Sequence, residues 1–131
     1  MKRPIVVSEG KNQAMEVREQ QAGVMLESLN PQQKKEFDRV LTDNVGKVLQ
    51  NYVAPKKDGK KYYGEIRFTL DAQGFIDQAN FKIRSGNDQL DQAVLNALIA
   101  TRKLDLSSDA YVSRAVTMFP MLFYYSDEDM E

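Results

Sequence analysis

The chain has 131 residues, a formal net charge of −1 and a hydrophobic fraction of 42%, which suits one globular domain with an extension. It contains no cysteine and no histidine, and this excludes disulfides, thiolate nucleophiles and every histidine-dependent mechanism. The nearly balanced charge also argues against a dedicated nucleic-acid-binding protein.

Residues 1–29 form a polar N-terminal extension. Their first apolar run, residues 5–7, is far too short for a signal peptide or a transmembrane helix, and it predicts only a short edge strand. We therefore expect either a cytoplasmic chain that begins natively at Met1 or a soluble part of a longer protein.

A weak helical stripe follows within residues 8–29 and predicts a partly ordered helix or a linker. The alternative interpretation is a helix that packs on a partner or on a second copy of the chain. The members of the stripe are Met15, Ala22, Met25, Leu26 and Leu29.

The next helix is predicted to begin at Asn30. Asn30 can cap it, Pro31 suits the first helical position, and Gln33 can complete a capping box. Pro55 ends the helix. The apolar residues that keep helical spacing in between are Phe37, Leu41, Val45, Val48 and Tyr52.

A basic loop, residues 56–61, leads into Tyr62 and Tyr63. One interpretation is that its lysines contact RNA phosphates while the tyrosines stack on bases. The other is a solvated loop whose lysines oppose aggregation. We favour the second, because the rest of the sequence offers no further basic surface.

Two alternating runs, residues 64–70 and 75–84, predict a β-hairpin. Residues 71–74 suit a type I turn closed by a left-handed glycine. The side chains expected in the core are Gly64, Ile66, Phe68, Leu70, Phe75, Ala79, Phe81 and Ile83. Those of the first run expected in solvent are Glu65, Arg67 and Thr69.

A second helix is predicted directly after the hairpin. Asn87 or Asp88 supplies the N-cap, and Asp91 lies near the positive end of the helix dipole. A helix of this length can lie across one face of the hairpin. Its apolar stripe consists of Leu90, Val94, Ala97, Leu98 and Thr101.

Residues 111–125 are apolar on both faces and predict a long final strand. Pro120 cannot donate to a β-ladder, so it indicates an edge position or a bulge. The acidic tail, residues 126–131, would discourage self-pairing of such an edge. The partner-binding residues predicted on this edge strand are Val112, Arg114, Val116, Met118, Pro120 and Leu122.

The order α-β-β-α-β predicts an α+β domain over residues 30–125. Its expected architecture has two layers, a three-stranded antiparallel sheet packed by two helices. The extension before residue 30 adds a further helical segment.

No group of residues predicts catalysis. The central carboxylates are explained by a wet strand face, a turn or a helix N-terminus, so a paired acid–base site is not expected. These carboxylates are Glu65, Asp71, Asp77, Asp88 and Asp91. We expect a protein without enzymatic activity, cofactor or metal.

Three stretches together carry a resemblance to a known family. They are the hairpin GEIRFTLDAQGFI (residues 64–76), the helix start SGNDQLDQAVLNAL (residues 85–98) and the Phe119-Pro120 pair of the closing strand. In this order they resemble the C-terminal periplasmic domains of TolA and TonB proteins, and those of TolA more closely. A preceding helix extends the likeness to residues 37–125.

The resemblance implies a non-catalytic periplasmic module that binds envelope proteins or peptides. TonB-like domains pair a receptor peptide with a sheet edge, which implies strand addition along residues 112–125. Membrane attachment would come only through an anchor outside this chain. A homodimer through the N-terminal helix or the edge strand is a further option.

The chain departs from the family pattern at one known feature. TolA domains commonly join the first strand to the second helix by a cysteine pair, whereas the matching regions here hold Glu65 and Asp91. Two other functions remain open. One is a cytosolic adaptor, chaperone or immunity-type protein of the same fold, and the other is an RNA-binding domain that uses residues 56–63.

Overall fold

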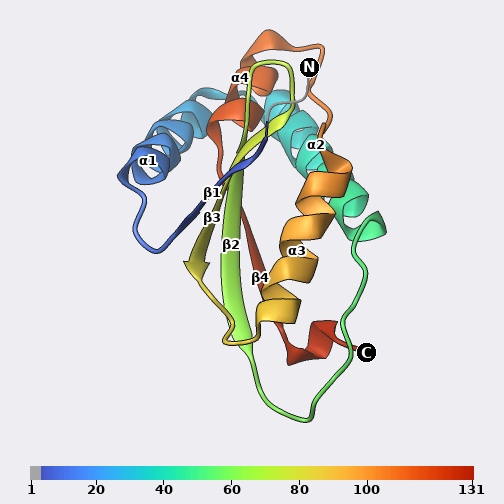
Figure 1. Cartoon of the computed structure of the whole chain (residues 1–131). Helices are drawn as coiled ribbons and strands as arrows, with labels where there is room; N and C mark the ends of the chain where they lie inside the picture. Colours follow the sequence, from blue (N-terminus) through green and yellow to red (C-terminus); the bar gives the residue numbers. More distant parts are fainter. Residues whose placement is uncertain (1–3) are drawn as a thin grey trace.

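The computed structural model describes residues 4–131, whose helices and strands are shown in Figure 1. In chain order the elements are β1 (Val6–Glu9), α1 (Gln13–Ser28), α2 (Pro31–Gln50), β2 (Tyr63–Leu70), β3 (Ile76–Ile83), α3 (Asp88–Thr101), α4 (Ala110–Met118), β4 (Met121–Ser126) and the short 3-10 helix η1 (Asp127–Asp129).

The sheet has the strand order β1-β3-β2-β4. β2 runs antiparallel to both β3 and β4, whereas β1 runs parallel to β3. The α+β class is confirmed, but the predicted three-stranded antiparallel sheet is wrong, because β1 adds a fourth, parallel strand. The short edge strand predicted at residues 5–7 is present as β1 and lies at an outer edge of the sheet. Its parallel pairing with β3 was not predicted, because a parallel pair formed through a long crossover has no local turn signal in the sequence.

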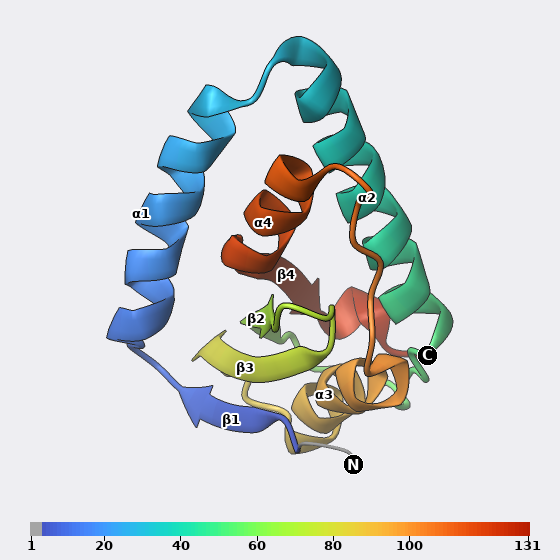
Figure 2. The same cartoon turned by 90° about the horizontal axis from the view of Figure 1, so that it is seen from above.

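One face of the sheet carries the main hydrophobic core. Buried side chains of α2, α3 and α4 pack there against β2, β3 and β4. Seen along the strands, α1 and α3 lie on opposite sides of the sheet (Figure 2). The buried side chains of α1, Met15 and Ala22, are not part of the main core cluster. The sheet is therefore covered on both faces, and the predicted two-layer arrangement is incomplete.

The predicted hairpin is confirmed. Gly74 has a φ of 93° and its N–H donates to the Asp71 carbonyl at 3.0 Å, which closes the turn. Strict alternation fails in β3, however, because its register shifts at Asp77 and Lys82, which have no β2 partner. These bulges place Ile76 in the core and leave Phe75 and Ile83 exposed, contrary to the prediction.

Arg67 and Thr69 are also buried, although alternation predicted them in solvent. The reason is α1, which covers this second sheet face. Glu19 of α1 accepts a hydrogen bond from Arg67 Nη1 at 3.0 Å, and Asn80 accepts one from Arg67 Nε at 2.8 Å. α1 is held by polar bonds together with only two buried apolar side chains of its own, Met15 and Ala22, so its sequence resembles that of an exposed helix or linker.

The predicted long final strand is wrong over its first half, which forms α4. The Asp109 carboxylate accepts hydrogen bonds from the N–H groups of Tyr111 and Val112 and caps this helix. Val112 and Val116 then lie one helical turn apart and are fully buried. Only residues 121–126 are extended. The β-branched and aromatic residues of this segment favour strand locally, but burial of the helical stripe outweighs that preference.

The acidic C-terminal segment packs against the domain. Met130 is buried, and the Glu131 N–H donates to the Pro55 carbonyl at 2.8 Å. In return, the Lys57 N–H donates to the Glu131 carbonyl at 2.6 Å. Residues 126–131 are therefore part of the folded domain in this structure.

Candidate protein-docking site

β4 forms one outer edge of the sheet, and β2 is its only strand partner among residues 4–131. Apart from this ladder, the main chain of residues 121–125 makes no backbone hydrogen bond to another element in the described part of the chain. The opposite edge of the sheet is β1. An unpaired strand edge offers donors and acceptors to an added strand.

The six residues predicted as a docking edge are not brought together. Leu122 lies in β4 and Pro120 directly precedes it, whereas the other four lie on α4. Val112 and Val116 face the core, so these two are enclosed by the domain rather than presented to a partner. The two on α4 that are not fully buried are Arg114 and Met118.

Side chains of β4 alternate between anchoring and accessible positions. Met121 and Tyr125 are buried in the main core, and Phe123 packs edge-on against Phe68 with ring centroids 5.4 Å apart. Leu122 and Tyr124 point to the second sheet face, where Leu122 is half-buried and Tyr124 is 65% exposed. The strand is thus held firmly through one face while its outer edge stays unpaired.

The end of β4 is fixed by a buried carboxylate. Asp91, 1% exposed, accepts hydrogen bonds from the Tyr125 hydroxyl at 2.7 Å and from the Ser85 N–H at 3.0 Å. Arg84 Nε donates to its other oxygen at 3.2 Å. Burial by itself opposes ionisation, but these hydrogen bonds outweigh it and hold the pKa of Asp91 below its usual value. Burial and the bond to Asp91 raise the pKa of Tyr125.

A glycine makes room for this arrangement. Gly64 pairs with Tyr125 across the β2–β4 ladder, and the phenol ring packs against the side of the glycine from which a Cβ would project. A Cβ at position 64 would overlap the ring carbons and the hydroxyl of Tyr125. Residue 64 must therefore be glycine for Tyr125 to reach Asp91 in this position.

An exposed surface lies beside the β4 edge on the second sheet face. The ladder places Glu65 between Tyr124 on β4 and Ile83 on β3, and Tyr63 lies next to them on β2. We call these four residues the open sheet face. The rings of Tyr63 and Tyr124 stack at a centroid distance of 6.4 Å, with an angle of 20° between their planes.

The tyrosine pair is linked to the carboxylate of the same face. Tyr63 donates its hydroxyl hydrogen to Glu65 Oε2 at 2.8 Å, and this bond raises the pKa of Tyr63 to about 12. The alternation of residues 64–70 predicted Glu65 in solvent, but it gave no indication that Glu65 lies beside Tyr63 and Tyr124. The signal that joins them is the strand register, which the sequence does not fix for β4.

The comparison with known families now decides the identity of the domain. The sequence model described as TonB C terminal matches residues 42–118, more than half of the chain. This protein belongs to the TonB C-terminal family. No curated protein and no solved structure gave a significant match to the chain. The resemblance to TolA and TonB domains is thereby confirmed, while the closer likeness to TolA stays a prediction.

The matched span of the TonB-family domain runs from within α2 to the end of α4 and stops before β4. Domains of this family generally bind protein partners in the cell envelope. Of the helices described in residues 4–131, none combines the length and the apolar character needed to cross a membrane.

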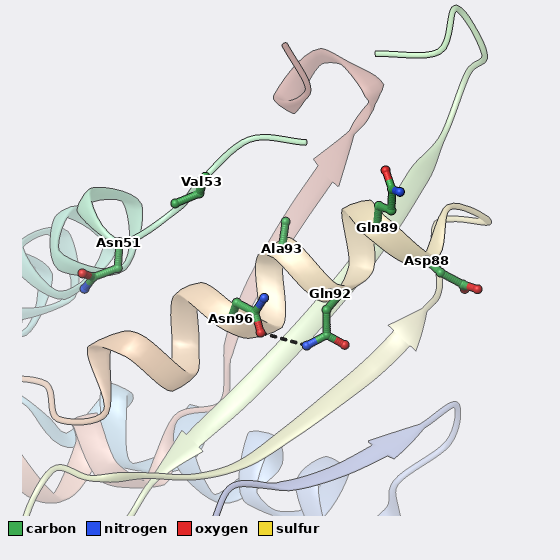
Figure 3. Close-up of a pocket in the computed structure, with 7 residues that line it drawn as sticks. All are labelled: Asn51, Val53, Asp88, Gln89, Gln92, Ala93 and Asn96. Carbon is green, nitrogen blue, oxygen red and sulfur yellow. Dashed lines mark hydrogen bonds between the residues drawn. The ribbon is translucent and has the colours of Figure 1, made fainter. Parts of the chain in front are cut away.

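A shallow groove of about 550 Å³ lies elsewhere on the TonB-family domain, between α3 and the segment after α2 (Figure 3). Its lining is mostly carboxamides, among them Gln92, whose Nε2 donates to Asn96 Oδ1 at 2.8 Å. Carboxamides do not serve as nucleophiles or general bases. Residues 4–131 also hold no cluster of three acidic ligands suited to a metal ion.

The basic loop of the TonB-family domain is partly neutralised by its own surroundings. Lys61 Nζ lies 3.6 Å from Asp127 Oδ2 of η1, and Tyr62 donates to the Asp58 carboxylate at 2.5 Å. Tyr62 and Tyr63 therefore have different partners, since Tyr63 belongs to the open sheet face. This division does not favour the stacked-base arrangement, and RNA binding stays an untested alternative.

Proposed function

We propose that this TonB-family domain binds an extended segment of an envelope protein in the periplasm, by addition of a strand to the outer edge of β4. The observation that supports this most directly is the free main-chain edge of residues 121–125, on a strand anchored from its other side. Main-chain hydrogen bonds would give affinity, and the alternating β4 side chains would give selectivity.

β4 is the better edge of the two for this role. It has six residues, compared with four in β1, so an added strand gains more ladder hydrogen bonds. The Tyr125–Asp91 bond and the capped η1 also fix its C-terminal end. A preformed edge lowers the entropic cost of binding. Leu122 and Tyr124 are the side chains that an added strand would meet on the second sheet face.

We propose no catalytic step and no cofactor for this activity. The buried carboxylate with a lowered pKa, Asp91, is fully engaged by Tyr125, Ser85 and Arg84. Its hydrogen bonds hold elements together, which is a structural task. Recognition through the β4 edge needs only the main chain and the side chains that surround it.

Site-specific cross-linking tests the proposal. A photoreactive amino acid would be placed at Tyr124 on the β4 edge and, as a matched control, at Val6 on the β1 edge; both positions are exposed, at 65% and 64%. The proteins would then be irradiated in periplasmic and cytosolic extracts. We expect a discrete envelope partner to be trapped from position 124 only. Trapping from position 6 alone would contradict the proposal, and a cytosolic partner at 124 would favour the adaptor or chaperone alternative.

A further inference from the structure

We infer that the open sheet face receives an arginine or lysine side chain from the segment added to β4. This inference rests on the proposed function and specifies the chemistry of the partner. The receiving groups are the stacked rings of Tyr63 and Tyr124 and the carboxylate of Glu65.

The first support is that this part of the sheet face is uncovered. Tyr63 is 49% exposed, Tyr124 is 65% exposed and Ile83 is 43% exposed. One ladder step further along the same face, α1 covers Arg67 and Asn80, which are almost completely buried. The open sheet face is therefore the part of the second face that α1 leaves accessible, and it borders the β4 edge directly.

The second support is that Glu65 has no ion-pair partner in the described part of the chain. Glu65 forms no ion pair with any lysine or arginine among residues 4–131. By contrast, Glu19 of α1, the helix that covers the neighbouring part of this face, has Arg67 as its ion-pair partner at 3.0 Å. Lys61, two residues before Tyr63, has its Nζ 3.6 Å from Asp127 Oδ2. A half-buried carboxylate that has no ion-pair partner and lies beside exposed aromatic rings is suited to bind a cation.

The third support is the shape of the aromatic pair. Its two rings lie nearly parallel, and both side chains are exposed beside Glu65. Cations are attracted to tyrosine faces, and the attraction grows when a carboxylate lies close by. The hydrogen bond from Tyr63 fixes the position of the Glu65 carboxylate, so this side chain loses little conformational entropy when a cation binds.

The reach of the partner side chain selects basic residues over shorter ones. Neighbouring strands are about 4.8 Å apart, so an added strand would lie about 10 Å from β2. A short side chain on that strand would touch only Tyr124. Arginine and lysine are long enough to pass over Tyr124 toward Glu65, and arginine can also stack its planar guanidinium on the ring. An acidic residue at the same place would be repelled by Glu65.

A peptide selection tests this inference. A bead-bound library of short random peptides would be sorted for binding to the wild-type domain, to Glu65→Gln and to the control Glu128→Gln. Glu65→Gln keeps an acceptor for Tyr63 and removes only the charge. Glu128 is an exposed acid of η1 without an ion pair in the described chain, so its substitution changes the net charge equally. Amide hydrogen exchange of residues 121–125 would show whether each selected peptide docks on β4.

We expect wild type and Glu128→Gln to select arginine or lysine at one fixed peptide position, and Glu65→Gln to lose that preference. Replacing this basic residue by norleucine should weaken binding to wild type about tenfold. The inference would be overturned if the selected peptides slow exchange in β4 but show no preference for a basic residue. It would also be overturned if they show that preference equally with Glu65→Gln. Either result would leave the proposal of strand addition intact. If no selected peptide protects β4, strand addition fails and the inference fails with it.

Discussion

The hydroxyl of Tyr125 donates a 2.7 Å hydrogen bond to Asp91, and this bond joins the end of β4 to the first turn of α3. Both residues are buried. We expect Tyr125→Phe to lower the free energy of unfolding by about 1–3 kcal/mol, because it leaves a buried carboxylate oxygen with one donor fewer. Urea denaturation measures this loss. Tyr124→Phe is the control, since the exposed Tyr124 hydroxyl makes no hydrogen bond in the described chain, and an equal loss there would contradict the account.

Asp91 should make the stability of the domain depend on pH. Its pKa is lowered in the folded state, so its contribution is complete above the unfolded value of about 3.9 and is lost as the pH falls through the lower folded value. We expect Asp91→Asn to be less stable than wild type at neutral pH. The difference should shrink in acid, and unfolding free energies measured across this range would reveal it. A difference that is constant with pH would mean that Asp91 is not ionised in the fold.

Gly64→Ala should destabilise the domain through overpacking. The new methyl group would collide with the Tyr125 ring, and we expect a loss of about 1–3 kcal/mol. Gly46→Ala in α2 is the opposite case, because no atom lies within 4 Å of the position that its Cβ would take. There we expect a gain of up to about 1 kcal/mol, since alanine is the better helix former. Thermal unfolding of both variants separates a steric effect from a general intolerance of substituted glycines.

Leu98→Ala should cost about 2–5 kcal/mol, because Leu98 is fully buried between α3 and the sheet and its removal leaves a cavity. The adjacent Ile99 is 47% exposed, so Ile99→Ala should cost far less. Equal losses measured by chemical denaturation would show that the buried face of α3 is assigned incorrectly.

Elements with local chemical signals were predictable from the sequence. The Asn30–Gln33 capping box is present in both directions, with hydrogen bonds of 2.8 and 3.0 Å. Asn87 caps α3, and Gly74 closes the hairpin in a left-handed conformation. Each of these depends on a few neighbouring residues, so tertiary packing does not change the outcome.

Features that depend on distant packing were not predictable in the same way. Arg67 is buried because α1 lies over it, with Glu19 as its ion-pair partner. The short edge strand at β1 was predicted, but its parallel pairing with β3 joins segments that are far apart in the sequence. The sequence of α4 predicts a strand as readily as a helix, because Val112 and Val116 fit both an alternating and a helical pattern. The proposed docking edge is therefore the shorter β4 instead of residues 112–125, and Tyr124 takes the place of the α4 residues in the proposal.

Amide hydrogen exchange on the complex tests the central claim most directly. The partner trapped at position 124 would be purified and added to the unmodified domain, and exchange would be followed at residues 121–125 of β4 and at β1. Strand addition at β4 predicts that exchange slows along residues 121–125 and stays unchanged in β1. Unchanged exchange at β4 in a saturated complex would contradict the claim. Slower exchange at β1 alone would show instead that the partner binds at the opposite edge of the sheet.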